Sequence, residues 1–257
     1  MLQAADPVLA PPIFGIAPSA LDAQAVADLV VQRRRTPAEG VGSIVTPNIQ
    51  HIALMRRDRE FAEAVRTADI RLCDGFPVYR YAAARGHRLP GRAAGREIVA
   101  RMMAAPASLA EHRILALLDS AAVADALRAW AERHGLGERV RAVVAPPAFL
   151  ADAAAQTKLV AEMRDFGTTI ALLCLGAPTS ELFVHRHRDA LPPCWTLCVG
   201  QSVKIALGLV PTPPPALVRL NLEWAWRIAL EPRRMIGRYV PAAAGFVAAV
   251  VQDLRGP

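Results

Sequence analysis

The sequence predicts an α/β fold, namely a Rossmann-like open parallel sheet with helices on both faces and a helical C-terminal appendage. Short aliphatic runs alternate with longer segments of helical periodicity. The runs are almost continuously apolar, as in strands that helices cover on both faces. The alternation stops after Gly208. A chain of 257 residues, 53% of them hydrophobic, is long enough to build a full core.

The core is expected to span residues 1–208. Its strands are predicted at residues 12–18, 42–48, 70–74, 113–119, 139–146, 169–176 and 195–200. Its helices are predicted at residues 20–35, 51–68, 95–104, 120–135, 149–167 and 180–191. Each helix follows a strand closely enough to form a β–α unit.

Residues 209–257 are expected to form the appendage. Four prolines within residues 211–215 break any helix or central strand. Two helical patterns follow, at residues 216–232 and 233–254, and no further strand.

The appendage carries an organised set of charges. An i, i+4 ladder consists of Arg219, Glu223, Arg227 and Glu231, and the next turns hold Arg233, Arg234 and Arg238. The ladder fits ordinary intrahelical ion pairs. The arginines that follow outnumber the local acids, and they fit either a solvated surface or a contact with diphosphate or lipid.

Overall charge and cysteine usage limit the class of protein. The net charge of +7 favours an anionic partner, such as a nucleotide or an acidic lipid surface, and charge alone does not choose between them. Four cysteines lie in or beside apolar segments without a C-x-x-C pair, so we expect buried, reduced thiols. No apolar run reaches the roughly 20 residues of a spanning helix. A cytoplasmic location is expected.

Ligands of open parallel sheets bind outside the carboxyl ends of the strands. The polar, glycine or proline positions there are Thr46, Asn48, Asp74, Gly75, Asp119, Ser120, Gly176, Pro178, Gly200, Gln201 and Ser202. Helix N-capping is the alternative explanation for such residues. For Asp74 a functional role is favoured, because the glycine after it permits unusual backbone angles or close approach of a ligand. Glycine-rich nucleotide loops and metal-binding motifs are absent, so no cofactor and no metal are predicted.

Four stretches together resemble the bacterial WecG/TagA/CpsF glycosyltransferases, glycosyltransferase family 26. They are TPNIQHIALMRRDREFAEAVRTADIRLCDGFPV, GRAAGREI, LCLGAPTSELFV and LNLEWAWRIALEPRRMIGRY, in this order along most of the chain. The last one, with its E-W-x-x-R-x-x-x-E-P-x-R pattern, is the most specific.

The resemblance implies inverting transfer of a sugar from a UDP-sugar to a polyprenyl-diphosphate-linked saccharide, without a required metal. It implies a peripheral enzyme on the inner face of the cytoplasmic membrane, in exopolysaccharide or other surface-polysaccharide synthesis. It implies no nucleic-acid partner, and a homo-oligomer is compatible with it.

By the same resemblance, Asp74 is the general base and the C-terminal arginines replace a metal at the leaving diphosphate. The residues at the positions of the family's motifs are Thr46, Asn48, Arg92, Pro178, Ser180, Glu181, Glu223, Arg227, Arg233 and Arg238, and among them Ser180 stands where the family has glutamine. The segment after Pro232 is expected both to lie on the membrane surface and to complete the active site.

The chain departs from the family pattern on the donor side. The P-K-Q-E motif is P-T-S-E at residues 178–181. The donor sugar is therefore open, with glucose and glucuronic acid as alternatives to N-acetylmannosamine. Two other functions remain as alternatives: a catalytically weakened homologue that binds lipid-linked saccharide or scaffolds other enzymes, and a Rossmann-type oxidoreductase, against which the missing glycine fingerprint argues.

Overall fold

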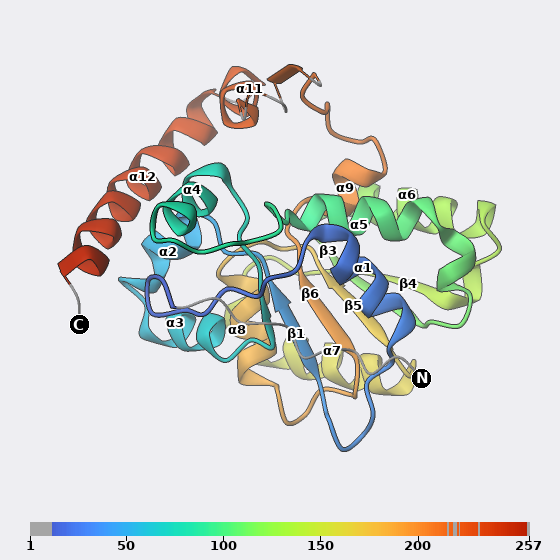
Figure 1. Cartoon of the computed structure of the whole chain (residues 1–257). Helices are drawn as coiled ribbons and strands as arrows, with labels where there is room; N and C mark the ends of the chain where they lie inside the picture. The colour runs from blue at the N-terminus through green and yellow to red at the C-terminus, as the bar shows by residue number, and fades with distance from the viewer. Residues whose placement is uncertain (1–11, 215, 218–219, 221, 231, 256–257) are drawn as a thin grey trace.

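The computed structural model describes residues 12–255, except residues 215, 218–219, 221 and 231. Its centre is a six-stranded, wholly parallel sheet with the strand order β2-β1-β6-β5-β3-β4 (Figure 1). The strands are β1 (Gly42–Val45), β2 (Ile70–Arg71), β3 (Ile114–Leu118), β4 (Val140–Val144), β5 (Ile170–Leu173) and β6 (Trp195–Cys198). The predicted parallel α/β sheet is thereby confirmed.

Helices cover both faces of this sheet. One face packs against α1 (Ala23–Gln32), α5 (Gly95–Ala104), α6 (Ala121–Arg133) and α9 (Ser202–Ala206). The other packs against α2 (Ile49–Met55), α3 (Arg59–Arg66), α7 (Ala153–Asp165) and α8 (Thr179–Arg186). Successive strand residues alternate between the two cores: Leu115 and Leu117 join the second, and their neighbours Ile114, Ala116 and Leu118 join the first.

The prediction of a strand at residues 12–18 is wrong. Phe14 and Gly15 both have positive φ angles, of 55° and 73°, and the chain turns back on itself. Ile13 and Ile16 then exchange two backbone hydrogen bonds of 2.8 and 3.0 Å as an isolated bridge. Both isoleucines are buried. Their apolar pattern therefore reflected burial and not a strand of the sheet.

The helices also differ from the prediction, and α9 is one that was not predicted. The helix expected at residues 51–68 is broken into α2 and α3, because Asp58 caps α3 by accepting a 2.9 Å hydrogen bond from the Phe61 amide. A helix that was not predicted, α4 (Phe76–Ala84), begins directly after Gly75. Pro77 lies in its first turn, where a missing amide hydrogen costs nothing.

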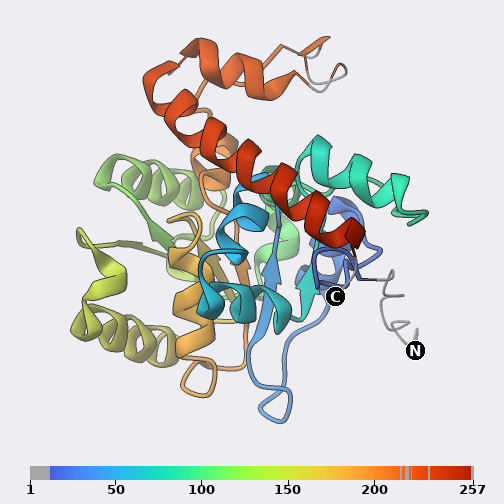
Figure 2. The same cartoon turned by 90° about the vertical axis from the view of Figure 1, so that its left-hand side faces the viewer.

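The appendage consists, in its described part, of α11 (Glu223–Leu230) and α12 (Pro232–Arg255), close to the two predicted helices. Figures 1 and 2 show α12 lying across α2. The two helices approach closely at Gly245, where an added Cβ would lie 2.6 Å from Ala53 Cβ. The division at residue 208 remains a prediction.

The end of α12 is fastened to the core through Asp253. Its carboxylate accepts hydrogen bonds from the Phe14 amide at 2.7 Å and from the Tyr81 hydroxyl at 2.6 Å. The Phe14 ring stacks on Tyr81 with centroids 4.7 Å apart, and Phe246 contacts Phe14 at 5.6 Å. These contacts fix the direction in which α12 crosses the core.

Candidate active site

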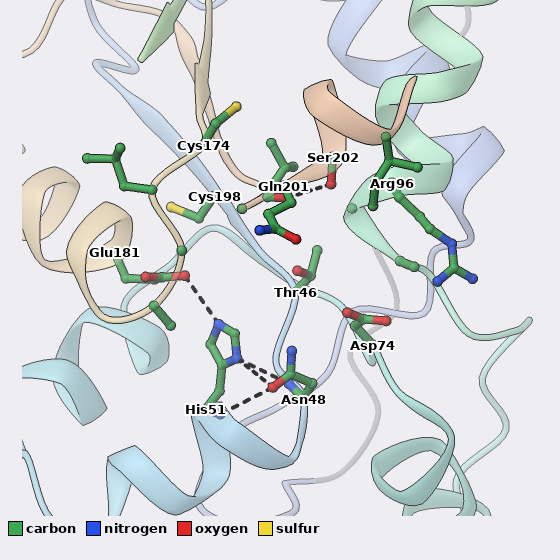
Figure 3. A pocket seen from close by; sticks show the side chains of 18 of the residues that line it. Thr46, Asn48, His51, Asp74, Arg96, Cys174, Glu181, Cys198, Gln201 and Ser202 are labelled. Atoms are coloured by element: carbon green, nitrogen blue, oxygen red, sulfur yellow. Dashed lines mark hydrogen bonds and ion pairs between the residues drawn. The ribbon is translucent and has the colours of Figure 1, made fainter. Parts of the chain in front are cut away.

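A polar pocket of about 250 Å³ opens at the carboxyl ends of β1, β2, β5 and β6 (Figure 3). Eight of the residues predicted from the sequence line it: Thr46, Asn48, Asp74, Gly176, Glu181, Gly200, Gln201 and Arg238. They come from five separate segments of the chain. They meet because parallel strands place their carboxyl ends at one edge of the sheet.

Six other predicted residues lie outside the lining of this pocket: Gly75, Arg92, Pro178, Ser180, Glu223 and Arg233. Ser180 is buried, and its hydroxyl donates to the Leu173 carbonyl at 3.3 Å, so it joins α8 to β5. Pro178 is the residue before α8. The side chain of Arg227 is outside the described residues.

The backbone around Asp74 extends the pairing of β2 with β1. The Leu72 amide donates to Val45 at 2.9 Å, and the Asp74 amide donates to Pro47 at 3.0 Å. Gly75 follows with a φ of 85°, a conformation that L side chains rarely adopt, and it turns the chain into α4. This turn leaves the Asp74 carboxylate in the pocket beside Thr46 and Asn48 (Figure 3).

The pKa of the Asp74 carboxyl is raised from its usual value. Burial is the main cause, and the positive charges of Arg96 and Arg92 oppose it without cancelling it. A carboxylate with a raised pKa is a stronger base than an exposed one. Asp74 can therefore accept a proton from a bound hydroxyl group.

Arg92, in the loop before α5, and Arg96, in the first turn of α5, share the carboxylate of Glu223 at the start of α11. Arg92 donates to Glu223 Oε1 at 2.8 Å, and Arg96 donates to both oxygens, 2.7 Å from Oε1. Burial raises the pKa of Glu223, but the hydrogen bonds from the two arginines outweigh it and hold that pKa below its usual value. Glu223 therefore forms ion pairs with Arg92 and Arg96 of the core, and these pairs join α11 to the edge of the pocket.

On the opposite side of the pocket from Arg96, His51 connects Asn48 to Glu181 (Figure 3). The side-chain oxygen of Asn48 caps α2, accepting from the Gln50 amide at 3.0 Å and the His51 amide at 3.4 Å. His51 Nδ1 lies 3.1 Å from that oxygen, and Nε2 lies 3.2 Å from Glu181 Oε1. Asn48 is thus a helix cap and a pocket residue at once.

The pocket is also reached by the appendage. Arg238 lines it from α12, and its Nε donates a hydrogen bond to Gln50 on α2. Arg233 lies at the start of the same helix and is exposed. The docking of α12 on α2 is what positions Arg238 at the opening.

Gly176 and Gly200 complete the wall formed by the ends of β5 and β6. Gly176 has a φ of 78°, and a Cβ added to it would meet nothing within 4 Å. Glycine is therefore favoured here by the backbone angle and not by a lack of room for a side chain. Gln201 follows Gly200 at the N-terminus of α9.

The main pocket residues that sequence reasoning missed are His51 and Arg96, whereas Asp119 and Ser202 were noted only as polar residues at strand ends. Arg96 had a usable signal, because it is a basic residue at the start of a predicted helix and close in sequence to Arg92. His51 had none, since its role depends on α2 meeting α8. In the described part of the chain, the four cysteines are buried and free, as predicted.

No group of three or more His, Cys, Asp or Glu side chains is arranged to hold a metal ion in residues 12–255 apart from the gaps named above. Within the same residues, no helix has the length and hydropathy needed to cross a bilayer.

The sequence of the chain is similar to those of several known proteins. Residues 11–257 match the sequence profile of the glycosyl transferase WecG/TagA/CpsF family. An N-acetylglucosaminyldiphosphoundecaprenol N-acetyl-beta-D-mannosaminyltransferase of Bacillus subtilis (strain 168) is 24% identical over 193 residues, 75% of this chain and 72% of that protein. A protein of the same name from Bacillus spizizenii is 32% identical over 78 residues, 28% of this chain and 30% of that protein. This second match covers less than two thirds of the relative's length.

Proposed function

The chain belongs to the WecG/TagA/CpsF family of glycosyl transferases, and from this premise we propose that it transfers a sugar, with inversion, from a UDP-sugar to a polyprenyl-diphosphate-linked saccharide. The printed names of the two relatives describe an acceptor of this class, N-acetylglucosaminyldiphosphoundecaprenol. The product would serve exopolysaccharide or another cell-surface polysaccharide. The observation that carries the proposal is the carboxylate of Asp74 in a pocket whose edge holds arginines.

Asp74 is the general base of the proposed reaction. Its carboxylate takes the proton of the acceptor hydroxyl while the hydroxyl oxygen forms a bond to the anomeric carbon. The bond from that carbon to the diphosphate oxygen breaks, and its electron pair leaves with UDP. The raised pKa of Asp74 suits this role, because a stronger base removes the proton more readily.

The leaving diphosphate gains negative charge, which guanidinium groups stabilise by paired hydrogen bonds. Arg238 and Arg96 line the pocket. Arg92 and Arg96 both donate hydrogen bonds to Glu223 Oε1. Arg233 precedes Arg238 on α12. We assign Arg238 and Arg233 to the diphosphate, and Arg227 with them on the basis of the family motif alone.

The outer side of α12 suits a membrane surface. Its exposed apolar side chains are Ile236, Val240, Val247, Val251 and Leu254. At about 100° per residue they fall within an arc of about 60°, opposite the face that packs on α2. Such a row can lie in the interfacial region beside anionic headgroups. The same helix carries Arg238, so binding to the membrane would bring the lipid-linked acceptor to the pocket.

A panel of UDP-sugars tested against lipid-diphosphate mono- and oligosaccharides, with products identified by mass spectrometry, tests the proposal. We expect one donor to be transferred and the product to have the inverted anomeric configuration. Binding of the lipid-linked saccharide without turnover of any donor would instead identify a binding or scaffolding homologue. Binding of a nicotinamide cofactor would favour an oxidoreductase.

A further inference from the structure

The guanidinium group of Arg96 is hydrogen-bonded to Glu223 of the appendage and not to Asp74. Arg96 and Asp74 both line the pocket, and Figure 3 shows their side chains on the same side of it. Burial raises the pKa of the Asp74 carboxyl, and the charge of Arg96 is the strongest of those that oppose this rise. Yet among the residues that the structure describes, no side chain donates a hydrogen bond to the Asp74 carboxylate.

Glu223 binds the Arg96 guanidinium through both of its carboxylate oxygens. Arg96 donates to Oε1 at 2.7 Å and also to Oε2, and Arg92 donates to Oε1 at 2.8 Å. Glu223 is buried, so little water competes for these bonds. A planar guanidinium that is bound to both oxygens of one carboxylate has a fixed orientation. Because Glu223 is the first residue of α11, the docking of α11 decides which acid Arg96 pairs with.

The other charged groups near Asp74 do not hold Arg96 in this way. Glu97 lies 3.3 Å from Arg96, but its side chain is 35% exposed, and exposed ion pairs are weak. The pocket also contains the titratable or charged side chains of His51 on α2, Asp119 after β3, Glu181 on α8 and Arg238 on α12. Of these, His51 faces Glu181 at 3.2 Å, and Asp119 faces Lys204 at 3.7 Å. Burial raises the pKa values of the nearby thiols far above their usual value, so no charge is carried by Cys73, Cys174 or Cys198.

Pairing with Arg96 would disable Asp74 as a base. A guanidinium beside an aspartate stabilises the charged form and lowers the pKa of that carboxyl by about 1 to 3. A base that removes a hydroxyl proton needs a carboxylate that is not already paired. Without Glu223, Arg96 would lose its two hydrogen bonds, and leaving a buried donor unpaired is costly. The unpaired Asp74 carboxylate in the same pocket would then be available as the replacement.

We propose that Glu223 is a positioning residue for the base: it holds the Arg96 guanidinium away from the Asp74 carboxylate, so that Asp74 is free to take the acceptor proton only while α11 is docked on the core. The inference rests on the proposed function, in which Asp74 is the base. It gives the appendage a second role besides bringing arginines to the diphosphate, because docking of α11 then activates the base.

The test is the pKa of the Asp74 carboxyl, measured on the full chain by ¹³C NMR with labelled aspartate carboxyl groups and assigned by the signal that Asp74→Asn lacks. Glu223→Gln keeps the shape of the side chain and removes its charge, and we expect it to lower this pKa by at least about 1. The control is Glu97→Gln, which removes the exposed acid beside Arg96 and should shift the pKa less than half as far.

Arg96→Met separates this mechanism from a simple loss of charge at Glu223. Alone, it leaves Glu223 paired with Arg92 and should raise the pKa of Asp74, because a nearby positive charge is gone. In the Arg96→Met background, Glu223→Gln should lower that pKa less than half as far as it does in the wild-type background. Equal shifts in the two backgrounds would show that Glu223 acts through its charge alone and would overturn the inference. An unchanged pKa in Glu223→Gln would overturn it as well.

The rate of sugar transfer distinguishes a failure of this inference from a failure of the proposed function. We expect kcat of Glu223→Gln to fall by about 10-fold or more at neutral pH, because a paired carboxylate loses much of the factor of about 10² to 10⁴ that a general base contributes. A lowered pKa with an unchanged kcat would overturn the base role of Asp74 and hence the proposed function. Unchanged pKa values in a protein that transfers sugar would overturn only the inference.

Discussion

Replacing Gly245 by alanine should shift α12 away from α2. Gly237, on the same helix, supplies a matched control. An added Cβ at Gly245 would lie 2.6 Å from Ala53 Cβ and 3.1 Å from Ala53 Cα, whereas at Gly237 it would meet nothing within 4 Å. Carbon atoms in contact stand about 3.5–4.0 Å apart, so the helix must move by about 1 Å. Alanine also favours a helix over glycine by about 1 kcal/mol at either position.

The helix-propensity gain is common to both variants, so their difference in stability measures the clash alone. Overpacking of this kind costs about 1–3 kcal/mol. For a chain of this size that corresponds to a difference in melting temperature of about 2–12 °C, with Gly237→Ala the more stable variant. Differential scanning calorimetry of the two proteins measures it directly.

Activity should separate the two variants further. Arg238 stands about two helical turns before Gly245 on α12, so a shift of α12 displaces it from the pocket. A misplacement of about 1 Å can cost up to about 100-fold in rate. We therefore expect kcat to fall by about 10- to 100-fold in Gly245→Ala and to stay near wild type in Gly237→Ala. Equal stability and equal rates in both variants would refute the docking of α12 on α2.

Three further outcomes follow from the proposed mechanism. Transfer should survive EDTA, because arginines take the place of a metal at the diphosphate; strict dependence on Mg²⁺ or Mn²⁺ would contradict this. Arg238→Ala, and to a smaller extent Arg233→Ala, should lower kcat by about 10-fold or more with little change in melting temperature, and full activity on a water-soluble acceptor would remove both from the reaction. Val247→Asp should weaken cosedimentation with liposomes that contain anionic lipids. The same substitution at Val144, which is exposed on the edge strand β4, should not. Equal binding of the two variants would exclude the apolar row of α12 as the membrane surface.

The sheet could be predicted from the sequence because its strands are buried on both faces. All five residues of β3 are buried, so Ile114–Leu118 forms a continuous apolar run that has no helical period. The segment at Ile13 and Ile16 has the same local appearance, but its turn depends on the positive φ angles of Phe14 and Gly15. Apolar content therefore predicted which segments are buried more reliably than it predicted which of them pair.

The site could be predicted where it depends on strand ends and not where it depends on contacts between helices. Thr46 and Asp74 follow β1 and β2, which are neighbours in the sheet, so topology alone brings them together. The link from His51 to Glu181 joins residues 130 positions apart on different helices. The pairing of Glu223 with Arg92 and Arg96 likewise needs the path of the appendage. Contacts between residues so far apart in the sequence cannot be predicted from local sequence patterns.

The central claim is that Asp74 removes the proton of the acceptor hydroxyl, and the rate of sugar transfer by Asp74→Asn tests it most directly. The account predicts that kcat falls by about 10²- to 10⁴-fold while the affinity for the UDP-sugar is kept. The variant should be no less stable at neutral pH. Burial raises the pKa of Asp74, so its stabilising contribution is present at low pH and is lost as the pH rises through that pKa, and asparagine avoids this loss. A folded Asp74→Asn protein that transfers sugar at close to the wild-type rate would contradict the account.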